Sequence, residues 1–157
     1  MKLQAADDGA MLLEEIPPFL FRLLGEIPGR ASSKHPRVEA RFFPEPGSDQ
    51  ELIEDWKTLV EPELHVLFQS ARETVRADLR GASASKGGFS MRIPKPHGDA
   101  WLGALNQARL AIAEESGFDE KDMAAEVVPD PEDPRAMTLF QIGFYGFLQE
   151  CLVRMQD

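Results

Sequence analysis

The stretch from about Arg135 to Met155 limits the choice of fold most, because its pattern is helical and apolar on nearly every side. A helix of that kind must either lie at the centre of a fold or be half covered by a partner. Two glycines, Gly143 and Gly146, would let a neighbouring backbone approach it closely. Its large apolar side chains are Leu139, Phe140, Ile142, Phe144, Tyr145, Phe147, Leu148 and Leu152.

Three earlier segments repeat apolar residues at the three-and-four spacing of a helix. The first is expected to begin at Pro17-Pro18 and to end at Pro28-Gly29, the second to run over about 49–79, and the third over about 99–115. Within the second, Pro62 is expected to kink or restart the helix, since proline removes a backbone hydrogen bond and clashes with the preceding turn.

The remaining segments predict a small sheet and its connections. Residues 2–13 have the pattern of a hairpin around Asp7-Asp8-Gly9, because an Asp-Gly pair supplies the positive φ angles of a tight turn. Residues 88–93 alternate like a third strand, whereas 81–88 are predicted to be a flexible loop and 30–47 an extended connection.

The predicted fold class is therefore α+β and helix-dominated, with about four main helices around a central C-terminal helix and a small antiparallel sheet of three strands. The length of 157 residues fits a single domain, 1–157. Residues 119–134 are expected to form an acidic linker with a short helix, capped by Asp119 and reaching about Val127.

Composition favours an ordinary globular protein of the cytoplasm. No run of about 20 apolar residues is present for a membrane span, and the N-terminus lacks the apolar core of a signal peptide. The single cysteine, Cys151, excludes an intrachain disulfide and a zinc cage of several thiolates. Its apolar surroundings predict a small buried side chain, and the alternative is a redox thiol.

The charges are segregated along the chain. The net charge of −10 opposes non-specific binding to nucleic acid. Residues 119–133 hold seven acids and one base, whereas 70–97 hold two acids and six bases. This basic face either pairs with the acidic segment of the same chain or binds phosphate, an acidic peptide or nucleic acid. Its members are Arg72, Arg76, Arg80, Lys86, Arg92 and Lys95.

Few residues predict chemistry. The three histidines, His35, His65 and His97, are far apart, and no phosphate-binding loop, nucleophile elbow or metal motif is present, so no metal or other cofactor is expected. A polar set falls within the helical patterns. An ion pair between its Arg109 and Glu150 would fix the register of two helices, and the alternative is a small-molecule pocket. The set is Asn106, Arg109, Gln149 and Glu150.

Three runs in order also resemble a known family. They are 41–44 (Arg-Phe-Phe-Pro), 100–110 (Ala-Trp-Leu-Gly-Ala-Leu-Asn-Gln-Ala-Arg-Leu) and 147–153 (Phe-Leu-Gln-Glu-Cys-Leu-Val). They are similar to a family described as a domain of unknown function, which includes the actinobacterial oxidative-stress regulator. The resemblance spans most of the chain and implies the same fold and no established enzymatic activity.

The resemblance also implies what kind of partner to expect. Genes of that family often lie near the adaptor of the Clp protease. Its characterised branch is a redox-responsive transcription regulator that binds an alternative sigma factor and uses two cysteines four apart near the N-terminus. This chain has no cysteine before Cys151, so that thiol switch does not carry over.

Three functions follow as hypotheses. The leading one is a non-enzymatic regulatory or adaptor domain that binds another protein, such as a regulator, a sigma factor or a protease adaptor, and that forms a homodimer. It would act in stress or transcription regulation. The alternatives are a nucleic-acid-binding regulator that uses the 72–95 face, and an enzyme with a pocket near Asn106, Arg109 and Glu150. Membrane association is not expected.

Overall fold

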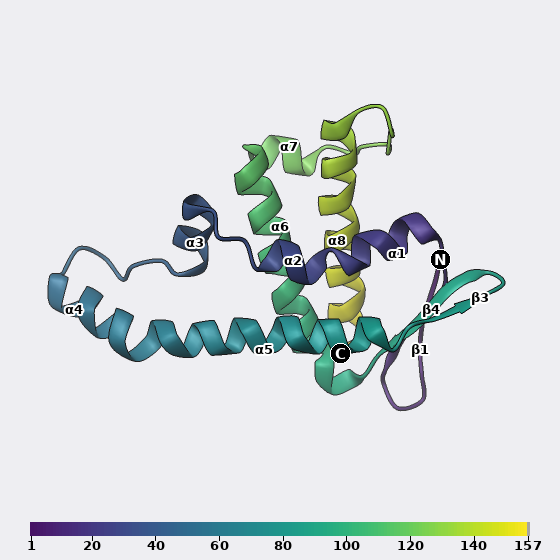
Figure 1. Cartoon of the computed structure of the whole chain (residues 1–157), viewed down its shortest axis with the longest axis horizontal. Coiled ribbons are helices and arrows are strands. Elements are labelled where there is room, and N and C mark those ends of the chain that lie inside the picture. The colour runs from purple at the N-terminus through teal and green to yellow at the C-terminus, as the bar shows by residue number, and fades with distance from the viewer. Residues whose placement is uncertain (157) are drawn as a thin grey trace.

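The computed structural model describes residues 1–156 and shows a layer of helices with a small sheet at one end (Figure 1). Helices α6 (Gly98–Ser116) and α8 (Pro134–Gln156) pack side by side, and α5 (Glu61–Arg80) crosses the N-terminal part of α6. The predicted α+β, helix-dominated class is confirmed. Within the described residues, no helix is both long enough and apolar enough to cross a membrane.

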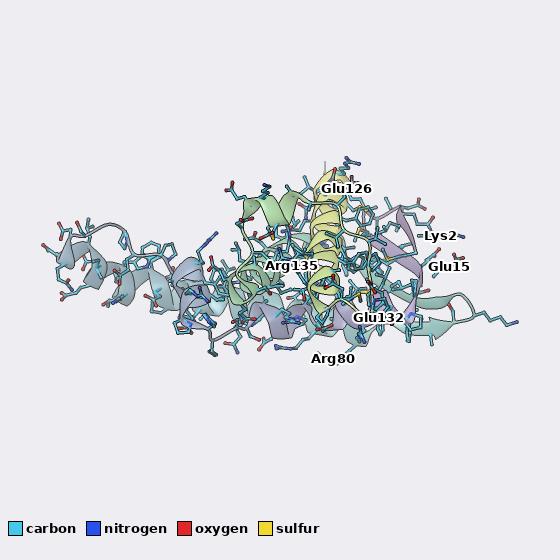
Figure 2. All side chains as sticks on the ribbon, turned by 90° about the horizontal axis from the view of Figure 1, so that it is seen from above. Lys2, Glu15, Arg80, Glu126, Glu132 and Arg135 are labelled. Atoms are coloured by element: carbon cyan, nitrogen blue, oxygen red, sulfur yellow. The ribbon has the colours of Figure 1, made fainter. Side chains whose placement is uncertain are left out.

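The sheet is antiparallel and has the strand order β1-β2-β4-β3. Strands β1 (Lys2–Ala5) and β2 (Met11–Ile16) form the predicted hairpin, and Gly9 has the expected positive φ of 85° in its turn. Across this pair, Lys2 and Glu15 form an ion pair of 3.0 Å, and Figure 2 shows them close together. Strand β4 (Gly88–Ile93) also lies where it was predicted.

The prediction of a flexible loop before β4 was wrong. Strand β3 (Ser83–Ser85) pairs with β4, so the sheet has four strands and not three. Lys86 and Gly87 form the two-residue turn between them. The serines and glycines of this segment were interpreted as flexible, but a short turn brings their backbone beside β4, where it completes hydrogen bonds that an isolated loop could not make.

Two predictions about the N-terminal helices were wrong. The first helix ends earlier, as α1 (Pro18–Gly25), and a second one, α2 (Ile27–Ala31), includes the residues expected to end it. Proline is tolerated in the first turn of a helix, where its missing N–H has no partner to lose, and Pro28 takes that place in α2. The segment predicted to be extended contains α3 (Pro36–Phe42) for the same reason.

The second helical pattern forms three consecutive pieces. They are α4 (Gln50–Asp55), a π-helical stretch η1 (Trp56–Val60), and α5. Asp49 caps α4 by accepting hydrogen bonds from the backbone N–H groups of Glu51 and Leu52. Pro62 lies in the first turn of α5, so the predicted restart occurs here, and the π stretch joins the two α-helices.

Helix α6, and not the C-terminal helix, lies at the centre of the fold. It packs against α2, α3, α5 and α8, whereas α8 packs mainly on α6. A short 3-10 turn, η2 (Lys95–His97), leads from β4 into α6, and Gly117 ends α6 in the left-handed conformation with φ 69°. The predicted central position of the last helix was therefore wrong, because only one side of it is covered. The side chains of α6 in the core are Trp101, Ala104, Leu105, Ala108, Ala111 and Ile112.

Candidate functional site

The uncovered side of α8 forms an apolar groove of about 710 Å³. Its floor is one face of α8, and its wall is the chain that follows the short helix α7 (Glu120–Ala124). Gly143 has no side chain to fill the floor, and apart from its chain neighbours and the backbone of its own helix no atom lies within 4 Å of where its Cβ would be. The groove is lined by Ala125, Glu126, Val127, Val128, Leu139, Phe140, Gly143, Phe144 and Phe147.

The groove exposes large apolar side chains. Phe147 is 47% exposed and Val128 is 82% exposed. Glu126 is the only ionisable residue among the lining side chains, so the groove offers no pair of acid and base groups for proton transfer. What it offers chemically is apolar surface that a bound side chain would cover.

The wall of the groove, residues 125–128, is part of the acidic segment 119–133, and contacts on either side of it hold it in place. Asp119 and Asp122 form a capping box that starts α7, and Asp122 pairs with Arg135 at the start of α8 at 2.6 Å. The hydrogen bond from the Asp119 backbone N–H, together with Arg135, lowers the pKa of the Asp122 carboxyl. Arg135 also lies over the ring of Phe118, 4.8 Å from its centroid. These contacts fix the two ends of the segment that forms the wall.

The acidic segment does not pair with the arginines of α5, which was one of the two alternatives for the basic face. Figure 1 shows α7 and α5 at opposite ends of the α6–α8 pair. Within residues 1–156, Arg72, Arg76 and Arg80 form no ion pair. Partial burial, and then the nearby charge of Arg76, lower the pKa of the Arg72 guanidinium. Arg76 and Arg80 are exposed.

The other three bases of the predicted face lie on the sheet and beside it. Lys86 is in the β3–β4 turn, which extends away from α5 in Figure 1. Arg92 pairs with Asp8, and Lys95 packs against Gly9 in the neighbouring hairpin turn. The six bases therefore form a band along the molecule and not a compact cluster.

The predicted ion pair between Arg109 and Glu150 is not formed. Arg109 Nη1 instead donates to Gln149 Oε1 at 2.8 Å, and its guanidinium lies across Gly146. Successive residues of a helix point about 100° apart, so only one of the two neighbours on α8 can face α6. Glu150 points outward and pairs with Arg154. Burial lowers the pKa of Arg109.

The fourth member of that polar set, Asn106, is also not part of the contact. It is exposed on α6, and within the described chain its side chain makes no hydrogen bond to the other three. The clamp between the helices consists of Arg109 and Gln149 alone. Among residues 1–156, no three His, Cys, Asp or Glu side chains are grouped closely enough to hold a metal ion.

The family model described as "Domain of unknown function (DUF2017)" matches residues 3–156. The chain belongs to the DUF2017 family. Membership in a family of that description was predicted from the sequence, and it is confirmed. No curated protein and no solved structure is detectably similar to this DUF2017 chain.

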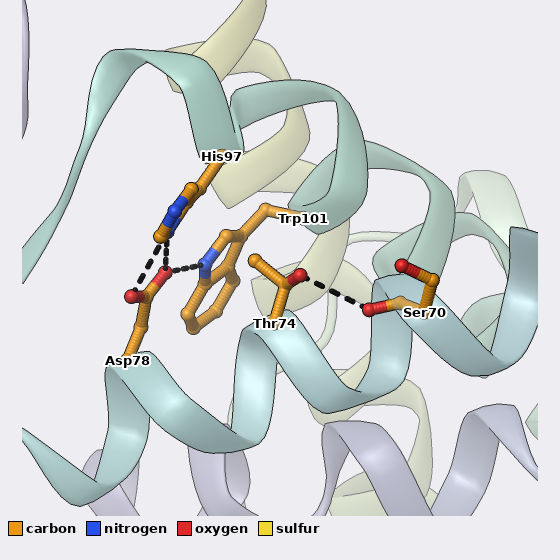
Figure 3. Close-up of polar contacts among 5 residues, drawn as sticks. All are labelled: Ser70, Thr74, Asp78, His97 and Trp101. Carbon is orange, nitrogen blue, oxygen red and sulfur yellow. Dashed lines mark hydrogen bonds and ion pairs between the residues drawn. The ribbon is translucent and has the colours of Figure 1, made fainter.

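A buried polar cluster of the DUF2017 chain was missed in the sequence. The Asp78 carboxylate accepts a hydrogen bond from Trp101 Nε1 at 2.9 Å, and its two oxygens lie 2.9 and 3.0 Å from His97 Nδ1 (Figure 3). The cluster ties α5 to the start of α6. The sequence contained a signal for this cluster, because Asp78 lies three residues after Val75 and therefore falls on the apolar face of α5.

A second buried contact joins the two ends of the DUF2017 domain. The Tyr145 hydroxyl donates to the carbonyl oxygen of Leu23 and accepts a hydrogen bond from Gln141 Nε2 at 2.9 Å. Burial raises the pKa of Tyr145 above its usual value. Tyr145 had been interpreted only as part of the apolar helix, and no local signal distinguishes a tyrosine with a buried partner from one that faces solvent.

Proposed function

We propose that the protein is a non-enzymatic regulatory or adaptor domain that binds another protein through the groove on α8. The observation that carries the proposal is the groove itself, which combines large exposed apolar side chains with a single ionisable residue. Exposed apolar surface of this kind is characteristic of protein interaction sites. A role in stress or transcription regulation is supported by the resemblance to the oxidative-stress regulator, and it is part of this proposal.

The charges around the groove select the chemistry of the partner. Glu126 is in the lining, and Asp130 and Glu132 follow in the same exposed segment. Figure 2 labels two of them, Glu126 and Glu132, near α8. Neither Glu126, Asp130 nor Glu132 forms an ion pair within residues 1–156. A bound segment would therefore combine apolar side chains for the floor with Lys or Arg for the rim, as an amphipathic basic helix does.

A model peptide tests this proposal directly. Two helical peptides are compared that share Leu at the i, i+3, i+4 and i+7 positions, one with Lys and the other with Glu at the remaining positions. NMR shift mapping is expected to place the Lys peptide over 125–128 and the facing side of α8, and the Glu peptide is expected to bind at least about tenfold more weakly. Substitution of Phe147→Ser should weaken binding by a similar factor.

The matched control is Val66→Ser, because Val66 is exposed and apolar but lies on α5. Equal affinity of the wild type and Phe147→Ser, or shifts confined to another surface, would overturn the assignment of the groove. In cells, a photo-crosslinking amino acid in place of Phe147 should form an adduct with a different protein that Leu139→Lys abolishes. An adduct only with a second copy of this chain would instead make the groove a self-interface.

A further inference from the structure

Helices α4, η1 and α5 together form a long arm, and its α4 end leaves the body of the molecule (Figures 1 and 2). Beyond their neighbours in the chain, α4 and η1 contact no other element extensively. The inner face of the arm is covered by the chain after α3. There the ring of Phe43 stacks on His65, with centroids 4.0 Å apart, and lies 5.5 Å from the ring of Phe68. The outer face has no such cover.

The outer face is a continuous exposed stripe. Its residues follow one another at alternating spacings of four and three, which places them on one face of the helix. Leu59 is 65% exposed and Val66 is 69% exposed, and Leu67 beside them is 61% exposed. These three lie near the middle of the arm. The exposed stripe consists of Leu59, Glu63, Val66, Ser70, Glu73, Ala77 and Arg80.

The two ends of the arm carry opposite charge. Residues 50–63 contain five acids and one base, Lys57. Residues 64–80 contain three arginines and two acids, and one of these acids, Asp78, is already bound to His97 and Trp101. Arg72 is half-buried beside Phe43 and His65 on the covered side of the arm. Arg76 and Arg80 are exposed and form no ion pair in the described chain, so their charge is available to another molecule.

We infer that two copies of this chain pair antiparallel through the outer faces of their arms. A two-fold interface places the same surface on both sides, so it must be complementary to itself. With a two-fold axis near Val66, the acidic 50–63 end of one copy would meet Arg76 and Arg80 of the other copy, and this contact would occur at both ends of the interface. The exposed apolar side chains would meet in the middle. A parallel pairing would instead set like charges together.

The size of the arm suits such an interface. The 20 residues of α5 alone span about 30 Å, which is the length of a long helix in a globular domain. The surface also lies away from the groove on α8, since the stripe belongs to η1 and α5. The dimer is therefore independent of the proposed binding of another protein.

The oligomeric state tests the inference first. Sedimentation over a concentration series is expected to show a dimer for the wild type. Val66→Lys should raise the dissociation constant by about tenfold or more. Val128→Lys, which changes an even more exposed valine off the arm, and Phe147→Ser, which alters the groove, should leave the dissociation constant unchanged. A monomer at every concentration, or a dimer that Val66→Lys leaves intact, would overturn the inference.

A charge exchange tests the antiparallel arrangement. Glu51→Lys with Glu54→Lys should weaken the dimer, and so should Arg76→Glu with Arg80→Glu. All four changes in one chain should restore it, because opposite ends again meet with opposite charge. If the fourfold variant is as weak as the two double variants, the ends do not meet. Circular dichroism checks folding, and all of these side chains are exposed.

Discussion

Removing the carboxylate of Asp78 by substitution with alanine should destabilise the fold more than any other single change of an acid. The Asp78 side chain is only 9% exposed, and the Trp101 indole that donates to it is completely buried. Hydrogen bonds to charged groups stabilise by about 1.5–3 kcal/mol, and a buried donor left without a partner costs about 1–3 kcal/mol. His97 contributes less, because 39% of its side chain is exposed.

We therefore expect Asp78→Ala to lower the free energy of unfolding by about 3 kcal/mol. For a chain of this size that corresponds to a fall in Tm of roughly 6–12 °C. Asp78→Asn should have an intermediate effect, because the amide oxygen still accepts from the indole. Urea and thermal denaturation followed by circular dichroism measure both quantities.

The control is Glu132→Ala, an exposed acid away from α5, for which a change within about 0.5 kcal/mol is expected. Equal Tm values for Asp78→Ala and Glu132→Ala would contradict this expectation. Such a result would mean that the indole N–H finds another acceptor or that the carboxylate costs as much to bury as its hydrogen bonds return.

Three other predictions follow from single residues. Gly88→Ala should destabilise the fold by about 2–4 kcal/mol, because Gly88 has φ 123° and an added Cβ would lie 2.4 Å from the carbonyl oxygen of Ile16. Gly103→Ala should instead stabilise it by about 0.5–1 kcal/mol, because Gly103 lies in α6 with open space around it. Urea denaturation measures the free energy of unfolding of both variants. Burial raises the pKa of the Cys151 thiol, so the pH at which its rate of reaction with Ellman's reagent is half-maximal should be higher than that of an exposed Val128→Cys in a Cys151→Ser background. The hydrogen bond from the Ala10 N–H, and then the contact with Arg92, lower the pKa of Asp8 in the folded state. Its contribution is therefore complete above the unfolded pKa of about 3.9 and lost as the pH falls through the folded one, so the Tm difference between wild type and Asp8→Asn should vanish under acid.

Elements with strong local signals were predicted well. The hairpin turn at Gly9, the strand 88–93 and the glycine that ends α6 each depend on one or two residues whose backbone preferences are decisive. Errors arose where a proline or a run of small residues was interpreted as a break. Proline at the first turn starts a helix as readily as it ends one, and only the neighbouring chain shows which occurs.

The predictions of which charged residues pair with each other were wrong for a different reason. Arg109 was paired with Glu150 because both are charged, but the rotation of α8 against α6 brings Gln149 to the guanidinium. Similarly, one of the two alternatives for the basic face paired the acidic segment with the arginines of α5, and Asp122 instead pairs with Arg135, which is close in the chain. The charges of a residue are visible in the sequence, whereas the direction in which its side chain points is not.

The last helix shows what the sequence determined by itself and what only the tertiary structure decided. Its composition required that one side be buried in the fold and left open whether the rest would be covered by the same chain. The periodicity of a helix is a local property, so the sequence contained it. Which side faces α6 depends on how distant segments pack, and that packing leaves Phe147 and its neighbours in an open groove.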